Sequence, residues 1–158
     1  MNSNVEEIRA LMLQLLDVTQ RKTRLARSGI DPERVVFNDI PIWRVRDVVG
    51  HIGVWNGEAA HSLRAHAMGG EYHCIESEMK YDEYNAAAVE ERRAWNIDQV
   101  WAEYEASSNE LKLFVETVPD ENWNTDMLYP WNERGTVRKL IEIMMKHEVE
   151  HREIMSGG

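Results

Sequence analysis

The sequence predicts an all-α protein, an up-down-type four-helix bundle with one additional helix between its second and third long helices. Four stretches of about 20 residues carry apolar side chains at helical spacing, and turn-forming residues separate them. No segment alternates convincingly between polar and apolar residues, as a strand would. The chain has 158 residues, the length of one domain, so we expect residues 1–158 to form a single domain.

The first predicted helix covers about residues 4–28 and stops at Gly29, because glycine commonly follows a helix C-terminus. Residues 30–42 contain two prolines and are predicted to be a connector, in which residues 34–37 are a candidate short strand. The apolar stripe of the helix consists of Val5, Ile8, Leu11, Met12, Leu15, Leu16 and Val18.

The second predicted helix covers about residues 45–68 and ends before a pair of glycines. Residues 71–80 show no periodicity and are predicted to be a loop. The additional helix is predicted at about residues 82–95, around a run of three alanines. The core side of the second helix carries Val45, Val48, Ile52, Trp55, Ala59 and Leu63.

The last two long helices are predicted at about residues 97–118 and 136–154. Asn96 and Thr136 are suitable N-caps, because their side chains can accept hydrogen bonds from backbone N–H groups of the first turn. Residues 119–135 are predicted to be a loop. The stripe of the helix at 97–118 consists of Val100, Trp101, Tyr104, Ser108, Leu111, Phe114, Val115 and Val118.

The composition narrows the choice of partners and compartment. With 28 acidic and 18 basic residues the net charge is −10, which argues against nucleic acid, because phosphate binding needs clustered Lys and Arg. No apolar run approaches the roughly 18 residues that cross a bilayer, and no signal peptide is evident, so we expect no membrane partner. Cys74 is the single cysteine, and a reduced cytoplasmic location is the simplest interpretation.

The helix predicted at residues 136–154 carries two histidines at the centre of its apolar face. His147 and His151 lie about 40° apart on a helical wheel that turns about 100° per residue, close to Leu140 and Met144. Residues at i and i+4 are neighbours, so the two imidazoles can converge on one ion. Unpartnered buried ring nitrogens would cost about 1–3 kcal/mol each, which favours a metal over hydrogen-bonded core histidines.

A third ligand is expected from another helix, because open metal sites usually have three protein ligands. His51 is the best candidate, because it lies at the margin of the core face of the second helix, between Val48 and Trp55. The sequence therefore predicts that His51, His147 and His151 bind a divalent metal such as zinc, nickel or iron. Weaker candidates, interpreted as solvent-exposed, are His61, His66 and His73.

The residues around His147 and His151 also allow a rival interpretation. Residues 147–151, HEVEH, satisfy the H-E-x-x-H motif of zinc proteases, in which Glu148 would activate water. Few residues follow His151 to supply a further ligand, and no evident strand is present to align a peptide substrate. We therefore favour the protease less, and the alternative interpretation of Glu148 is a flank residue of a surface helix.

Two segments resemble the DinB-like superfamily, which includes bacillithiol- and mycothiol-dependent enzymes, and within it the DfsB-type branch is the more similar. Residues 43–59, WRVRDVVGHIGVWNGEA, resemble the family's helix with a metal-ligand histidine. Residues 131–154, WNERGTVRKLIEIMMKHEVEHREI, resemble its closing helix with an H-x-x-x-H pair. The resemblance implies the DinB/YfiT-like bundle and supports His51, His147 and His151 as ligands. Arg44 stands where the family often has a capping Ser or Thr.

The resemblance also implies a function. We expect a thiol-dependent S-transferase or related detoxification enzyme that acts on a small electrophile, with a low-molecular-weight thiol as a further cofactor and a homodimer as the assembly. Glu58, Tyr129 and Trp131 are candidates for the pocket. Three alternatives stay open: a metal-dependent hydrolase, a non-catalytic protein that sequesters small molecules in stress resistance, and a purely structural metal that ties two helices together.

Overall fold

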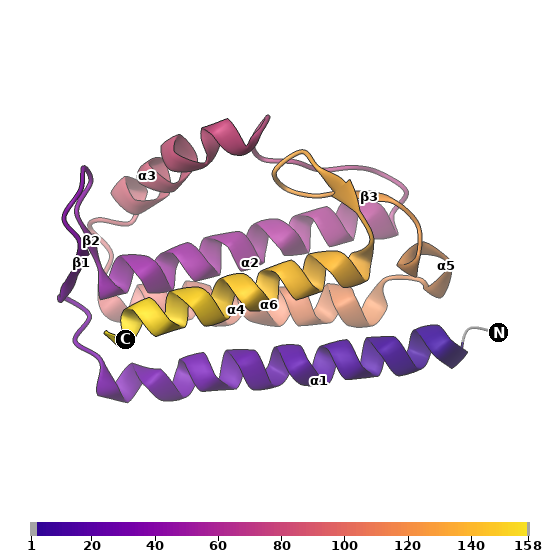
Figure 1. The fold of residues 1–158 in the computed structure, drawn as a ribbon, viewed down its shortest axis with the longest axis horizontal. Coiled ribbons are helices and arrows are strands. Elements are labelled where there is room, and N and C mark those ends of the chain that lie inside the picture. The colour runs from indigo at the N-terminus through magenta and orange to yellow at the C-terminus, as the bar shows by residue number, and fades with distance from the viewer. Residues whose placement is uncertain (1–2, 158) are drawn as a thin grey trace.

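The computed structural model describes residues 3–157, which are mainly α-helical (Figure 1). Helices α1 and α6 run in one direction along the bundle, and α2 and α4 run in the opposite direction. This architecture confirms the predicted all-α bundle. The long helices are α1 (Ser3–Ala26), α2 (Val45–Ala67), α4 (Ile97–Thr117) and α6 (Val137–Met155). Within the described residues, no helix is long and apolar enough to span a membrane.

The additional helix α3 (Tyr81–Glu91) explains why α2 and α4 are parallel. Figure 1 shows that it carries the chain back along the bundle, so that α4 begins at the same end as α2. The helix ends four residues before its predicted end at residue 95. The N–H groups of Arg92 and Trp95 donate to carbonyls three residues earlier, which makes tight turns in place of a further α-helical turn. Asn96 then caps α4 as predicted, because its side chain accepts the N–H of Gln99 at 2.9 Å.

The end of α1 also differs from the prediction. The α-helix stops at Ala26, and the chain continues as a 3₁₀ helix, η1 (Arg27–Gly29). Gly29 is not among the glycines with positive φ, so it does not form the left-handed cap that was expected. Gly69 does have a φ of 80° and follows the end of α2 in that role.

Short elements occupy the connectors between the long helices. The candidate strand at residues 34–37 is observed as one strand of an antiparallel hairpin. The region predicted as a loop at 119–135 holds a short helix and a second hairpin. These elements are too short to produce a periodic sequence pattern. They are β1 (Val35–Phe37) with β2 (Trp43–Arg44), η2 (Glu78–Lys80), α5 (Asp120–Trp123), and β3 (Met127–Leu128) with β4 (Arg134–Gly135).

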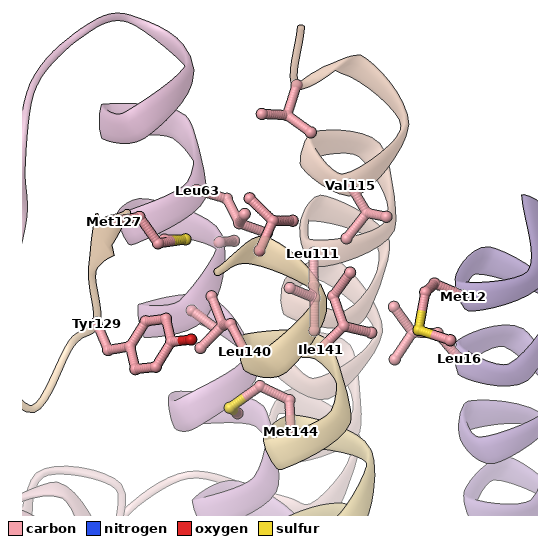
Figure 2. Close-up of a cluster of buried hydrophobic side chains, with 14 of the residues drawn as sticks. Met12, Leu16, Leu63, Leu111, Val115, Met127, Tyr129, Leu140, Ile141 and Met144 are labelled. Carbon is pink, nitrogen blue, oxygen red and sulfur yellow. The ribbon is translucent and has the colours of Figure 1, made fainter. Parts of the chain in front are cut away.

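The core lies between the four long helices. Figure 2 shows side chains from α1, α2, α4 and α6 that meet at the bundle axis. Leu11, Leu15 and Val18 are 47%, 43% and 37% exposed, so the apolar stripe of α1 is wider than the face that packs. The central cluster includes Met12, Leu16, Leu63, Leu111, Val115, Leu140, Ile141 and Met144.

Candidate metal centre and adjoining pocket

Three histidine side chains converge between α2 and the C-terminal half of α6. His51 comes from α2, and His147 and His151 come from successive turns of α6. The Nε2 atoms of His51 and His147 are 2.9 Å apart. One ring nitrogen from each of the three residues lies within 4.8 Å of the other two. The structure therefore brings together the three residues that the sequence had selected as a set.

The closest pair of donor atoms has the spacing expected of two ligands on one metal ion. With metal–nitrogen bonds of about 2.0–2.1 Å, ligand nitrogens at bond angles of about 90–110° are separated by about 3–3.4 Å, close to the 2.9 Å observed for His51 and His147. The Nδ1 of His151 lies 2.9 Å from the carbonyl oxygen of His147, to which it can only donate. This contact leaves the Nε2 of a neutral His151 with a free lone pair, as metal-binding histidines require.

Burial keeps the three imidazoles uncharged. Desolvation, together with the nearby His147 and His151, lowers the pKa of His51 well below 6.5. Desolvation, with a smaller contribution from His151, lowers the pKa of His147 to about 3. The pKa of His151 is also lowered, mainly by burial. Metal binding needs the neutral form of imidazole, so at pH 7 no proton has to be displaced from the cluster.

A pocket of about 270 Å³ opens directly beside the three histidines. Trp55 of α2 forms part of its wall, and its ring centroid lies 5.2 Å from that of Tyr81 and 6.4 Å from that of Trp131. Asn85 of α3 and Met144 of α6 also line the pocket. The three imidazoles line this space together with the aromatic rings.

A second hollow of about 460 Å³ borders two of these histidines, His51 and His151. The hairpin of β1 and β2 and the start of α3 form this hollow, and it includes Asp39 and Asp82. Trp43 of β2 places its ring edge against His51, with 5.3 Å between centroids. The hairpin thus covers one side of the candidate metal centre.

The contribution of α3 to the pocket was not predicted from the sequence. Tyr81 and Asn85 line the pocket, but the helix shows no clear apolar stripe from which its inner face could be assigned. The available signal was the spacing of Tyr81, Tyr84 and Asn85, at i, i+3 and i+4, which places all three on one face.

Of the three residues that were predicted to line the pocket, the structure places one in its lining and two outside it. Trp131 lines the pocket. Tyr129 packs behind Trp131, with ring centroids 5.2 Å apart, and its hydroxyl donates to the carbonyl of Thr136 at 2.7 Å. Glu58 is buried away from the pocket and accepts hydrogen bonds from the hydroxyls of Tyr72 and Tyr84. Tyr129 and Glu58 therefore support the walls from outside.

Glu148 is not a flank residue of a surface helix, so that interpretation was wrong. Its side chain is 1% exposed, because α1 and α4 cover this side of α6. The carboxylate accepts hydrogen bonds from Thr23 at 2.6 Å, from Asn56 at 3.1 Å and from the hydroxyl of Tyr104. Glu148 thus points into the bundle and does not face the histidines, where the protease interpretation would need it.

The other three histidines of the chain lie outside the cluster. His61 is exposed, and the ring of His73 lies 3.1 Å from the carboxylate of Glu76. His66 is 9% exposed, and its Nε2 lies 2.9 Å from the carbonyl oxygen of Asn122. The prediction that His66 is solvent-exposed was therefore wrong, because the connector after α4 folds over the end of α2.

Comparisons with known proteins agree with this fold. Solved structures of a mycothiol-dependent maleylpyruvate isomerase (TM-score 0.71, 14% identity) and of a histidine-to-alanine variant of that enzyme (TM-score 0.70, 13% identity) are similar to this chain. Each match covers 96% of this chain but 60% of the other, so the chain spans 60% of the enzyme's length. A comparison with curated proteins finds no match. The profile of the DinB superfamily matches residues 5–155, and the chain therefore belongs to the DinB superfamily.

Proposed function

We propose that this protein binds one divalent metal ion through His51, His147 and His151 and catalyses a thiol-dependent S-transfer or related reaction on a small electrophile. The observation that carries the proposal is the convergence of three neutral imidazoles in the lining of an aromatic pocket. When bound, zinc, nickel or iron would supply a Lewis acid that lowers the pKa of a coordinated thiol or water.

The residues of the chain would prepare the reaction in two ways. The bond from His151 to the carbonyl of His147 fixes the orientation of one ligand ring. The aromatic walls hold the apolar part of a substrate and exclude water from its reactive end. The thiol is proposed because the similar solved structures are of an enzyme named as mycothiol-dependent. The single domain, the homodimer and the cytoplasmic location stay predictions.

The alternatives differ in what the pocket is for. A metal-dependent hydrolase would use water in place of the thiol, and a sequestration protein would hold its ligand without turnover. A structural ion that only ties α2 to α6 would need no adjoining space, and the pocket of about 270 Å³ therefore favours a site that receives a ligand.

The ligand assignment is tested by elemental analysis of purified protein. We expect about one ion per chain in the wild type and a large loss in His147→Ala, because two histidines hold a metal weakly. His61→Ala is the matched control, since His61 is exposed on the same helix as His51 and outside the cluster. Wild-type metal content in His147→Ala would overturn the assignment.

The same proteins test the reaction with monochlorobimane and cysteine as a simple thiol. In the expected step, the thiolate sulfur forms a bond to the electrophilic carbon, chloride leaves, and the thiol proton passes to solvent. Many turnovers per chain that need both thiol and metal, and that are lost in His147→Ala but kept in His61→Ala, would support the S-transferase. Consumption limited to one equivalent would indicate sequestration, and thiol-independent breakdown would indicate a hydrolase.

A further inference from the structure

We infer that the pocket beside the histidines selects an uncharged aromatic substrate that carries a hydrogen-bond acceptor, and that the side-chain amide of Asn85 orients this acceptor. The inference rests on the proposed function, because it takes this pocket as the place where the electrophile binds. It goes further by naming the chemical class of that electrophile and a residue that determines specificity.

The walls match a flat apolar ring. Trp55, Tyr81 and Trp131 present neighbouring aromatic surfaces. The ring centroid of Trp55 lies 5.2 Å from that of Tyr81 and 6.4 Å from that of Trp131. Aromatic rings prefer offset or edge-to-face contacts at these separations, so a substrate ring can continue the series. Ile143 and Met144 add aliphatic surface from α6. The volume of about 270 Å³ lies near the lower limit of ligand pockets, roughly 300 Å³, which favours a small molecule.

Apart from a bound metal ion, the surroundings of the pocket offer no positive charge to an anionic substrate. Among the described residues that line this pocket, none is a lysine or an arginine. Arg92 lies in a small cavity next to His51, but its guanidinium binds the carboxylate of Glu103 at 2.6 Å. Asp39 and Asp82 line the adjacent hollow and add negative charge. A carboxylate held away from the ion would lose its hydration and find no cationic side chain in return.

Asn85 supplies the polar group of the pocket in a fixed orientation. The indole N–H of Trp55 donates to Oδ1 of Asn85 at 2.8 Å. Indole N–H can only donate, so the oxygen of the amide must face Trp55 and the NH₂ group must face the other way. Among the side-chain hydrogen bonds of residues 3–157, the one made by Asn85 is the bond that its Oδ1 accepts, and its NH₂ group donates none. Asn85 borders both the pocket and the second hollow, so an acceptor on a bound molecule can reach the amide.

The geometry gives the substrate a defined orientation. A ring held by Trp55 and Trp131 would turn its carbonyl or similar oxygen toward Asn85 and its reactive carbon toward the histidines. A ring without an acceptor would bind less tightly and without that orientation. Asn85 is thus a positioning residue for the proposed reaction.

Binding of acetophenone and ethylbenzene, measured by equilibrium dialysis on the protein as purified, tests the role of Asn85. Asn85→Asp keeps an oxygen for the Trp55 N–H but removes the donor, and we expect it to weaken acetophenone binding about tenfold, equivalent to about 1.4 kcal/mol. Ethylbenzene, which has no acceptor, should change little. Asn109→Asp adds the same charge at an exposed position of α4 and should bind both compounds as the wild type does.

A second variant separates the lost donor from the added charge. Asn85→Leu is uncharged and similar in size, and it should also lose the preference for acetophenone over ethylbenzene. Unchanged acetophenone binding in both Asn85 variants would overturn the inference. A thermal melt of each variant checks that the fold is retained.

The charge preference is tested with benzoate after chelation, so that coordination to a metal cannot contribute. We expect benzoate to bind at least about tenfold more weakly than acetophenone. Equal or tighter binding of benzoate would overturn the uncharged class of substrate. Failure of the metal proposal would appear in the elemental analysis of His147→Ala and would leave these titrations unaffected.

Discussion

His147 and Glu148 are neighbours in the sequence but belong to different environments. His147 faces α2 and the pocket, whereas Glu148 points into the bundle and accepts hydrogen bonds from Thr23, Asn56 and Tyr104. Adjacent residues of a helix point about 100° apart, so each can face a different neighbour. The H-E-x-x-H motif thus contains two separate features, a candidate metal pair and a buried polar link between α6 and the helices α1, α2 and α4.

The lowered pKa of His147 predicts how stability depends on pH in metal-free protein. The unfolded residue has a pKa of about 6.5 and the folded one a pKa of about 3, so between these values the unfolded state binds more protons. The free energy of unfolding should therefore fall as the pH is lowered from 6.5 toward 3, with a contribution of up to about 1.4 kcal/mol per pH unit from His147. Urea unfolding at a series of pH values measures this slope.

The slope of unfolding free energy against pH should be compared between proteins with and without the buried imidazole of His147. His147→Gln should show a shallower slope than the wild type, because glutamine does not titrate. His61→Ala should keep the wild-type slope, because His61 is exposed on the surface of α2. Identical slopes in His147→Gln and the wild type would contradict the lowered pKa of His147.

At the scale of the elements, glycines of α2 determine how closely α4 approaches. A Cβ atom built on Gly53 would lie 3.1 Å from the Cα of Tyr104, whereas one built on Gly50 would have its nearest neighbours at 3.8 Å. The two helices thus touch backbone to backbone at Gly53. This contact fixes the position of α2 in the bundle and with it the position of His51.

Alanine substitutions at these two glycines should have opposite effects on stability. Gly53→Ala should lower the free energy of unfolding by about 1–3 kcal/mol, because the new methyl group meets the backbone of α4, which cannot move aside independently. Gly50→Ala should be neutral or raise it by up to about 1 kcal/mol, since alanine favours helix and the space is sufficient. Chemical denaturation of both variants measures the difference, and equal stability would contradict the close approach.

At the scale of the whole molecule, the pocket depends on segments far apart in the sequence. Its walls come from α2, α3, α6 and the loop between β3 and β4, which contribute Trp55, Asn85, Met144 and Trp131 respectively. Helix α3 passes along the bundle above α2 (Figure 1). Its residues Tyr81 and Asn85 line the pocket beside the histidines. The bundle holds the candidate ligands, and α3 gives the site its second wall.

Removal of a bound ion should destabilise the whole bundle. An ion that binds only the folded chain stabilises it by about 2.7 kcal/mol at 100 times its Kd, which corresponds to about 5–10 °C in Tm for a domain of this size. A chelator should therefore lower the Tm of the wild-type protein by about that amount. His51→Ala should melt at the same temperature with and without chelator. A wild-type Tm that does not respond to chelation would argue against a tightly held ion.

The sequence by itself determined the four long helices, the extra helix and the group of His51, His147 and His151. Helical periodicity and the i, i+4 spacing are local properties, so the residues themselves reveal them. Only the tertiary structure decided that Leu11 and Leu15 stay exposed, that Glu148 and His66 are buried, and that Asn85 borders the pocket. A helix pattern shows which faces are apolar, but the packing of neighbouring segments decides which faces are covered and which line a cavity.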